Sequence, residues 1–285
     1  HFDHGRFLGG NLCHHVSSKE TGMTWLQAVI IAIVEGLTEF LPVSSTGHMI
    51  LASALMGIHE DDFVKSFEVI IQLGAILAVL AIYYKRFLVS FDIYLKLFVA
   101  FLPTGIMGFL AYKTIKAYLF NPTTVSISLI VGGIVLILLD KWTAKRESRY
   151  AEIEHISYLD AFKIGVIQCL SMIPGVSRSA ATIFGGVYSG FNRVQAAEFS
   201  FLLAIPTMFA ATGYDVLKNH ELFTADTAPI MALGAAVAFV VALLAVKAFV
   251  SFLTKYGFKH FGWYRIVIGV LFLVYAYSTG LQLGV

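Results

Sequence analysis

Six long apolar blocks, separated by short polar segments, constrain this chain more than any other feature of its sequence. A transmembrane helix needs roughly 20 consecutive, mostly apolar residues, and each block meets or approaches that length. Only 13% of the 285 residues are charged, whereas a soluble domain carries about 25%. We therefore expect an all-α integral membrane protein with crossings at 66–84, 88–112, 123–140, 194–213, 228–253 and 262–281.

Two further regions, 24–58 and 158–190, are apolar at both ends but are interrupted by Pro, Gly, Ser and Thr. Each half is too short, or barely long enough, to cross a bilayer. Irregular backbone at membrane depth persists only where it is buried in protein or lines a wet cavity. We therefore expect two re-entrant helical hairpins. The alternative is that 24–41 and 158–173 are ordinary spans.

The two interrupted regions resemble each other without a gap when 35–46 is written above 168–179, which places Ser44 over Ser177. The chain then divides into two repeats, each a re-entrant hairpin followed by three transmembrane helices. Because three crossings are an odd number, the second repeat enters the membrane from the opposite side, as in many transporters. We expect these inverted repeats at 24–145 and 157–285.

The N-terminal segment 1–22 differs from the rest, because it is polar, rich in His and Gly, and without periodicity. We interpret it as an added tag, an unprocessed leader or a disordered tail. Residues 23–285 are expected to form a single membrane domain.

Lys and Arg in short loops predict the orientation, because cytoplasmic loops are enriched in positive charge. One side of the expected topology carries Lys85, Arg86, Lys141, Lys145, Arg146, Arg149, Arg193, Lys255, Lys259 and Arg265. The other side carries Lys65, Lys113, Lys116 and Lys218. The first side is therefore expected to be cytoplasmic. The first hairpin would enter from outside and the second from the cytoplasm.

Glu35 and Glu39 stand one helical turn apart inside an otherwise apolar run, so they share one helix face. Ionisable residues at membrane depth are costly and mark functional sites by default. Two carboxylates on one face repel each other unless a divalent metal, an arginine or a shared proton lies between them. The alternative is a pair of hydrogen-bonded structural acids.

A polar cluster, Ser44-Ser45-Thr46-Gly47-His48, follows directly after Pro42. Proline ends a helix, and a serine or threonine then caps the next one, so a purely structural cap is one interpretation. In a new helix His48 would face back toward the Ser45 hydroxyl, and an imidazole beside a hydroxyl can act as a general base or acid. We favour the functional interpretation.

The second hairpin carries Arg178 among small and hydroxyl residues: Gly175, Ser177, Ser179 and Thr182. A guanidinium at membrane depth needs an anion, and it binds phosphate bidentately. Glycine permits close approach of the backbone, and a helix N-terminus with Ser hydroxyls provides donors for an anion. Alternatively, Arg178 only neutralises the glutamates.

Gln168 and Met172 occupy, in the second hairpin, the places that Glu35 and Glu39 hold in the first. The second hairpin has lost its acids and gained an arginine. This divergence favours a single composite site, with acids from one hairpin and a cation from the other.

The two motifs, Glu35-Gly-Leu-Thr-Glu-Phe-Leu-Pro-Val-Ser-Ser-Thr-Gly-His48 and Pro174-Gly-Val-Ser-Arg-Ser-Ala-Ala-Thr182, resemble the signatures of the bacterial undecaprenyl pyrophosphate phosphatase family linked to bacitracin resistance. The similarity covers essentially all of 23–285. It implies hydrolysis of undecaprenyl pyrophosphate to undecaprenyl phosphate and inorganic phosphate, which recycles the lipid carrier for envelope polymers such as peptidoglycan. It also implies a divalent cation, magnesium or calcium, and a site facing the outer or periplasmic side of the cytoplasmic membrane.

The resemblance implies roles for individual residues. The catalytic set is Glu35, Glu39, Ser45, His48 and Arg178, with Glu35 and Glu39 also as metal ligands. The phosphate-binding set is Ser44, Thr46, Gly175, Ser177, Arg178, Ser179 and Thr182.

Several alternatives stay open at this point. Ser45 could be a nucleophile that becomes phosphorylated, activated by His48 or Glu39, or it could be a ligand while water attacks directly. Inverted repeats with broken helices also describe a polyprenyl phosphate transporter or flippase. The expected partners are a polyprenyl pyrophosphate lipid and membrane lipids. The net charge of +2 is too small to indicate nucleic acid, and a homodimer is compatible with the sequence.

Overall fold

The computed structural model describes residues 22–89, 91–119, 121–143 and 147–281. The predicted tag or leader at 1–22 therefore lies outside the described residues, apart from its last position. Within the described ranges the chain is helical and contains no strand. Six helices are long and apolar enough to cross a membrane: α3 (Asp62–Val89), α4 (Asp92–Leu119), α5 (Pro122–Thr143), α8 (Arg193–Lys218), α9 (Ala228–Tyr256) and α10 (Lys259–Thr279). All six predicted crossings are confirmed as helices, and the chain is a multi-pass membrane protein.

The two interrupted regions each form a pair of short helices joined by a non-helical tip. The first pair is α1 (Trp25–Thr38) and α2 (Ser45–Leu55), and the second is α6 (Tyr158–Gln168), extended by the 3-10 turn η2 (Cys169–Met172), and α7 (Arg178–Tyr188). These α-helices have 14, 11, 11 and 11 residues, well below the roughly 20 that a span requires. The predicted breaks are therefore present in both regions.

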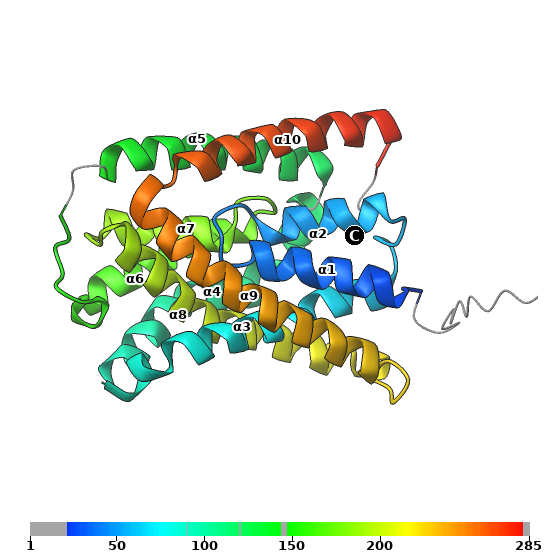
Figure 1. Ribbon diagram of the computed structural model, residues 1–285, viewed down its shortest axis with the longest axis horizontal. Helices are drawn as coiled ribbons and strands as arrows, with labels where there is room; N and C mark the ends of the chain where they lie inside the picture. Colours follow the sequence, from blue (N-terminus) through cyan, green and yellow to red (C-terminus); the bar gives the residue numbers. More distant parts are fainter. Residues whose placement is uncertain (1–21, 90, 120, 144–146, 282–285) are drawn as a thin grey trace, which may run out of the picture.

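Helix packing places both hairpins against the long helices. Helices α5 and α10 lie side by side along one edge, and α9 packs against both α1 and α3 (Figure 1). Helix α6 packs on α4, and α7 packs on α8. Close approach of α5 and α10 depends on small residues, because a Cβ added to Gly262 would lie 2.6 Å from the carbonyl oxygen of Gly133.

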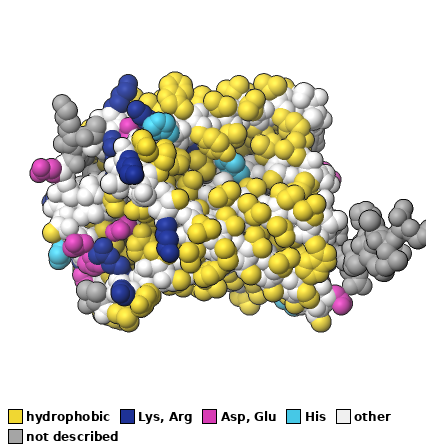
Figure 2. All heavy atoms as spheres, viewed as in Figure 1, with side chains coloured by type: hydrophobic (Ala, Val, Ile, Leu, Met, Phe, Trp, Pro, Cys, Tyr) yellow, Lys and Arg dark blue, Asp and Glu magenta, His cyan; other side chains and the backbone are white. Residues whose placement is uncertain are grey.

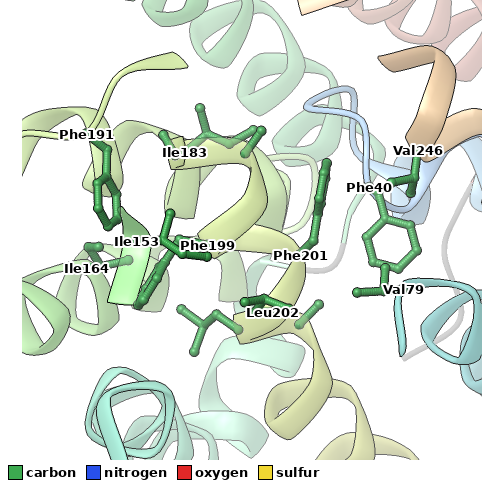
Figure 3. Close-up of a cluster of buried hydrophobic side chains, with 14 of the residues drawn as sticks. Phe40, Val79, Ile153, Ile164, Ile183, Phe191, Phe199, Phe201, Leu202 and Val246 are labelled. Atoms are coloured by element: carbon green, nitrogen blue, oxygen red, sulfur yellow. The ribbon is translucent and has the colours of Figure 1, made fainter. Parts of the chain in front are cut away.

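A cluster of buried apolar side chains fixes the tip of the first hairpin. Phe40, fully buried just after α1, meets Phe201 of α8 edge to face, with ring centroids 5.7 Å apart. Val79 of α3 and Val246 of α9 belong to the same cluster, and Figure 3 shows them on either side of the Phe40 ring. The first hairpin is thus packed against three of the long helices.

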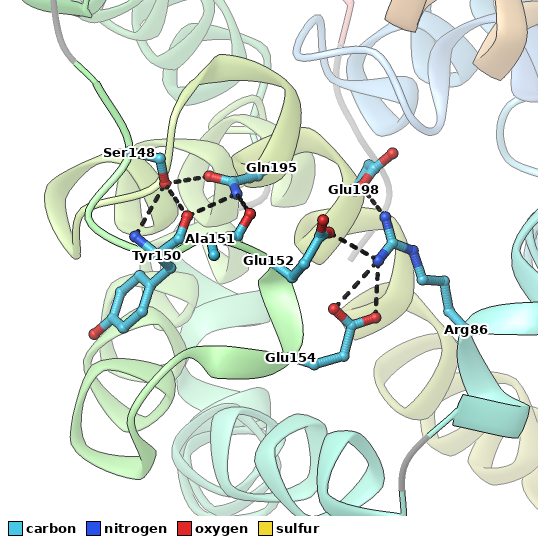
Figure 4. Close-up of polar contacts among 8 residues, drawn as sticks. All are labelled: Arg86, Ser148, Tyr150, Ala151, Glu152, Glu154, Gln195 and Glu198. Atoms are coloured by element: carbon cyan, nitrogen blue, oxygen red, sulfur yellow. Dashed lines mark hydrogen bonds and ion pairs between the residues drawn. The ribbon is translucent and has the colours of Figure 1, made fainter.

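A group of charged side chains fastens the connection between α5 and α6. Arg86 at the end of α3 pairs with Glu152, with Glu154 in the 3-10 turn η1 (Ile153–His155), and with Glu198 of α8, at 3.0 to 3.4 Å (Figure 4). The Arg86 side chain is 31% exposed, so each pair contributes modestly to stability. Together they hold the connection against α3 and α8.

Candidate active site

The tips of the two hairpins have the same local backbone geometry. Ser44 and Ser177 have φ angles of 72° and 78°, and they are the only non-glycine residues with positive φ in the described chain. Each caps the helix that follows, because its hydroxyl accepts a hydrogen bond from the backbone N–H three residues later. A left-handed serine is strained, and such strain gathers at functional sites. The alignment of Ser44 over Ser177 is therefore matched in three dimensions.

Three side chains from the two hairpins join into one polar unit. The hydroxyl of Ser45 donates a hydrogen bond to Oε2 of Glu39, and Nη2 of Arg178 donates to Oε1 of the same carboxylate at 3.1 Å. Glu39 is 8% exposed and Ser45 is 9% exposed. The predicted meeting of acid and arginine from opposite hairpins is thus present, with Glu39 between the hydroxyl and the cation.

Arg178 has a further anchor and a free donor. Its Nη1 donates to the backbone carbonyl of Ser200 in α8 at 3.1 Å, and its guanidinium lies 5.8 Å from the centre of the Phe40 ring. Its Nε is buried, and within the described residues it has no hydrogen-bond partner. A buried donor without a partner is costly, so Arg178 is both fixed in place and able to bind one more acceptor.

Glu35 is fully buried, and neither of its carboxylate oxygens finds a hydrogen-bond donor among the described residues. The Glu35 carboxylate lies close enough to Glu39, Glu68 and Arg178 to interact electrostatically with all three side chains. Such an orphaned acid is compatible with a cation. No cluster of three or more His, Cys, Asp or Glu in the described chain is arranged to hold a metal. If a cation binds here, Glu35 and Glu39 could supply two of its ligands.

His48 does not contact the Ser45 hydroxyl that the sequence predicts it to face. Its Nδ1 lies 2.8 Å from the carbonyl oxygen of Ser44, and its Nε2 lies 2.8 Å from the hydroxyl of Tyr264 in α10. The His48 and Tyr264 rings also stack, 5.6 Å apart. With both ring nitrogens engaged, His48 supports the backbone at Ser44 and is not hydrogen-bonded to Ser45. Of the two bases considered for Ser45, Glu39 is the one in contact.

The predicted phosphate-binding hydroxyls of the second hairpin have partners within the protein. Ser179 donates to the carbonyl of Leu41 at 2.7 Å and so ties the two hairpin tips together. The Thr182 hydroxyl oxygen lies 2.6 Å from the hydroxyl oxygen of Ser200. The Ser177 hydroxyl oxygen lies 3.0 Å from the hydroxyl oxygen of Ser179. These contacts hold the tips in place.

Gly175 and Thr46 are the remaining residues of the predicted phosphate-binding set. Gly175 has a φ of +90°, and a Cβ there would lie 2.5 Å from the carbonyl oxygen of Val125, so only glycine fits. Thr46 is exposed in the first turn of α2, unlike its buried neighbours Ser44 and Ser45. Its side chain is therefore accessible to a ligand.

Arg265 is a site residue that the sequence did not indicate. The sequence predicts a loop cation at this position, but Arg265 lies within α10 and is fully buried. Its guanidinium donates five hydrogen bonds to backbone carbonyls, which belong to Pro42 (3.0 Å), Gly175 (2.8 Å), Val176 (2.9 Å), Ser128 (3.1 Å) and Leu129 (3.3 Å). One side chain therefore fastens both hairpin tips to α5. The sequence carries one signal of this role: Arg265 lies three residues inside the expected crossing 262–281.

Comparisons with known proteins identify the family of this chain. The family model described as bacitracin resistance protein BacA matches residues 28–271. The undecaprenyl-diphosphatase of Wolinella succinogenes is 53% identical, with 89% of this chain and 98% of the relative covered. The proteins of the same name from Bdellovibrio bacteriovorus and Aquifex aeolicus are both 50% identical. The first comparison covers 90% of this chain and 97% of the relative, the second 89% and 99%.

Proposed function

The chain belongs to the bacitracin resistance protein BacA family, and from this premise we infer that it is itself an undecaprenyl-diphosphatase. It hydrolyses the phosphoanhydride bond of undecaprenyl diphosphate to give undecaprenyl phosphate and inorganic phosphate. The observation that carries this inference is the buried unit in which Glu39 joins the Ser45 hydroxyl to Arg178. A hydroxyl, a carboxylate base and an arginine are groups that can carry out phosphoryl transfer.

The proposed reaction begins with Ser45 as the nucleophile. Its oxygen attacks the distal phosphorus, its proton passes to Glu39, and the bond to the bridging oxygen breaks, so that undecaprenyl phosphate leaves. Glu39 passes that proton to the departing phosphate. Water then attacks the phosphoserine phosphorus and gives a proton to Glu39, the bond between phosphorus and the Ser45 oxygen breaks, and Glu39 gives the proton to that oxygen, so that inorganic phosphate and free Ser45 are released. In the rival route, water activated by Glu39 attacks directly and Ser45 is only a ligand. The direct contact between Ser45 and Glu39 favours the covalent route.

Arg178 stabilises the phosphoryl group in this proposal. Its unpartnered Nε and its Nη2 can donate together to two phosphate oxygens, the geometry that guanidinium favours. Nη1 stays on the Ser200 carbonyl, so the arginine need not reorganise when substrate arrives. Thr46, Ser44 and the N-termini of α2 and α7 supply further donors, while Gly175, Ser177, Ser179 and Thr182 shape the cradle.

Glu35 and Glu39 would hold a divalent cation, magnesium or calcium, together with pyrophosphate oxygens. When bound, such a cation offsets the charge that develops on the phosphate oxygens. The support for this proposal is the buried Glu35 carboxylate, whose two oxygens lack donors in the described structure. His48 has a supporting role, since it fixes the backbone of Ser44 next to the nucleophile.

We also propose two inverted repeats, with the hairpins entering from opposite faces. The pairing of helices supports this arrangement: α1 packs on α9 as α6 packs on α4, and α5 packs on its counterpart α10. Both ends of the described chain lie at one end of the bundle (Figure 1). Lys and Arg gather at the opposite end, as Figure 2 shows on one face. The basic end would face the cytoplasm of a bacterial cell, and the site would open to the outer side of the inner membrane.

Phosphate release from undecaprenyl diphosphate by the protein in detergent tests the proposed function. Detergent abolishes the two compartments that a flippase needs, so release there identifies hydrolysis. We expect turnover by the parent protein, at least a thousandfold loss in Ser45→Ala, and little change in Ser53→Ala. Ser53 is a buried serine of α2 whose hydroxyl donates to the carbonyl of Met49. A parent protein that releases no phosphate would refute the proposal.

A further inference from the structure

Ser200 is a fully buried polar residue of the apolar helix α8. Its backbone carbonyl accepts a hydrogen bond from Nη1 of Arg178 at 3.1 Å, but its hydroxyl has no part in the reaction described above. Burying a hydroxyl is costly unless the group is hydrogen-bonded. The Ser200 hydroxyl oxygen lies 2.6 Å from the hydroxyl oxygen of Thr182 in α7, so this hydroxyl is directed at the helix that carries the arginine.

The acceptors available to each hydroxyl set the direction of this contact. The Thr182 hydroxyl lies 2.9 Å from the backbone carbonyl oxygen of Arg178 and 3.2 Å from that of Ser179, so its one hydrogen has acceptors within its own helix. Among the described residues, the Ser200 hydroxyl has no acceptor other than the Thr182 oxygen. Ser200 is therefore the donor and Thr182 the acceptor, because only this direction gives both hydroxyl hydrogens an acceptor.

These hydrogen bonds form a closed ring through Arg178. The Ser200 hydroxyl binds Thr182, the Thr182 hydroxyl binds the Arg178 backbone, and the Arg178 guanidinium returns to the Ser200 carbonyl. One residue of α8 thereby holds the arginine at both its backbone and its guanidinium. With Nη1 held on α8, the atoms left for a phosphate are Nη2, which also binds Glu39, and Nε, which has no partner among the described residues.

Packing in turn fixes the position of Ser200. Its neighbours in the sequence, Phe199 and Phe201, are both fully buried, and Phe201 meets Phe40 with ring centroids 5.7 Å apart. Figure 3 shows Phe40 and Phe201 next to each other. The Arg178 guanidinium lies 5.8 Å from the centre of the same Phe40 ring. Helix α8 is therefore held against the tip of the first hairpin, and Ser200 links that position to the arginine of the second hairpin.

We propose that Ser200 is a positioning residue, whose carbonyl and hydroxyl together direct Arg178 at the phosphate of the substrate. The position matters because a displacement of about 1 Å costs about 100-fold in rate, and because bidentate binding of phosphate by arginine requires a defined geometry. The expected effect on rate rests on the proposed function. The expected effect on phosphate binding does not, since binding can be measured without hydrolysis.

Turnover of undecaprenyl diphosphate by the full chain in detergent gives the first test. Ser200→Ala removes the hydroxyl and keeps the carbonyl, and Thr182→Val removes the next hydroxyl of the ring. Both should lower kcat about 10- to 100-fold. The matched control is Thr207→Val, because the Thr207 hydroxyl also lies on α8 but donates to the carbonyl of Leu203 in its own helix at 2.9 Å. We expect this control to keep its kcat, while the thermal midpoint falls by similar amounts in all three variants.

Binding of inorganic pyrophosphate separates positioning of the arginine from a general structural role. Ser200→Ala should weaken binding about tenfold, the effect of one lost hydrogen bond to a charged group. In a protein that already carries Arg178→Ala, adding Ser200→Ala should cause no further loss, because the hydroxyl acts through the arginine.

An equal loss of binding with and without Arg178 would overturn the proposal, and so would a Ser200→Ala protein with the kcat and pyrophosphate affinity of the parent. A parent protein that shows the expected binding pattern but releases no phosphate from the lipid would refute the proposed function and leave the positioning role of Ser200 standing.

Discussion

Replacing Arg265 with lysine should damage both the stability and the activity of this protein. The guanidinium makes five hydrogen bonds to carbonyls, three of them in the hairpin tips. A lysine ammonium has three donors, so at least two bonds are lost. At about 1.5–3 kcal/mol for each bond to a charged group, the gross loss is about 3–6 kcal/mol. Relaxation and hydration of the lysine offset part of it, and we expect a net loss of about 3 kcal/mol.

The effect on activity follows from what Arg265 holds. It joins the tip that precedes Ser45 to the tip that precedes Arg178, and misplacement of reacting groups by about 1 Å costs about 100-fold in rate. We therefore expect Arg265→Lys to lower kcat about 100-fold and to lower the midpoint of thermal unfolding in detergent.

Arg193→Lys is the matched control for this substitution. Arg193 also binds a carbonyl of α5, that of Asp140, but at the basic end of the bundle. The Arg193→Lys protein should be somewhat less stable than the parent and should keep its kcat. A folded Arg265→Lys protein with near-normal kcat would refute the positioning role.

Four further substitutions and one metal titration test the site. Glu39→Gln should lower kcat by about 10²–10⁴, the usual contribution of a general base, while the protein still elutes as a folded species. Glu35→Gln should leave activity dependent on a higher concentration of magnesium or calcium, and a chelator should abolish turnover of the parent; an unchanged metal requirement would remove Glu35 from the metal site. Ser179→Ala breaks the bond to Leu41, should cost about 1–3 kcal/mol in the free energy of unfolding, and should raise KM. Tyr264→Phe removes only the hydroxyl next to His48, so a loss of about 1 kcal/mol with kcat within tenfold is expected; a complete loss of activity would mean that His48 takes part in chemistry.

Local features of the sequence predicted the helices and the breaks between them. Block length and apolar composition are properties of a single segment, so the six crossings were visible without tertiary information. Pro42 followed by serines predicted the end of one helix and the cap of the next, and both are present. The cost of burying Glu39 and Arg178 predicted that they would meet, and they form an ion pair at 3.1 Å.

Features that depend on distant backbone were not predictable in the same way. Arg265 is satisfied by carbonyls of segments up to 223 positions away, and carbonyls carry no sequence signal. His48 was expected to face Ser45, but the direction of its ring is set by Tyr264, which reaches it from α10. The hydroxyl of Thr182 contacts Ser200 of α8, and the hydroxyl of Ser179 donates to Leu41 of the other hairpin. Both roles depend on how the second hairpin packs against distant segments.

Rapid quenching of the reaction with undecaprenyl diphosphate labelled in its distal phosphate tests the central claim most directly. If Ser45 takes the phosphoryl group while Glu39 takes the proton, the quenched protein will carry label on the peptide that contains Ser45, and Ser45→Ala will carry none. Turnover at the normal rate without labelled protein, or a Ser45→Ala variant that keeps most of its activity, would contradict this account.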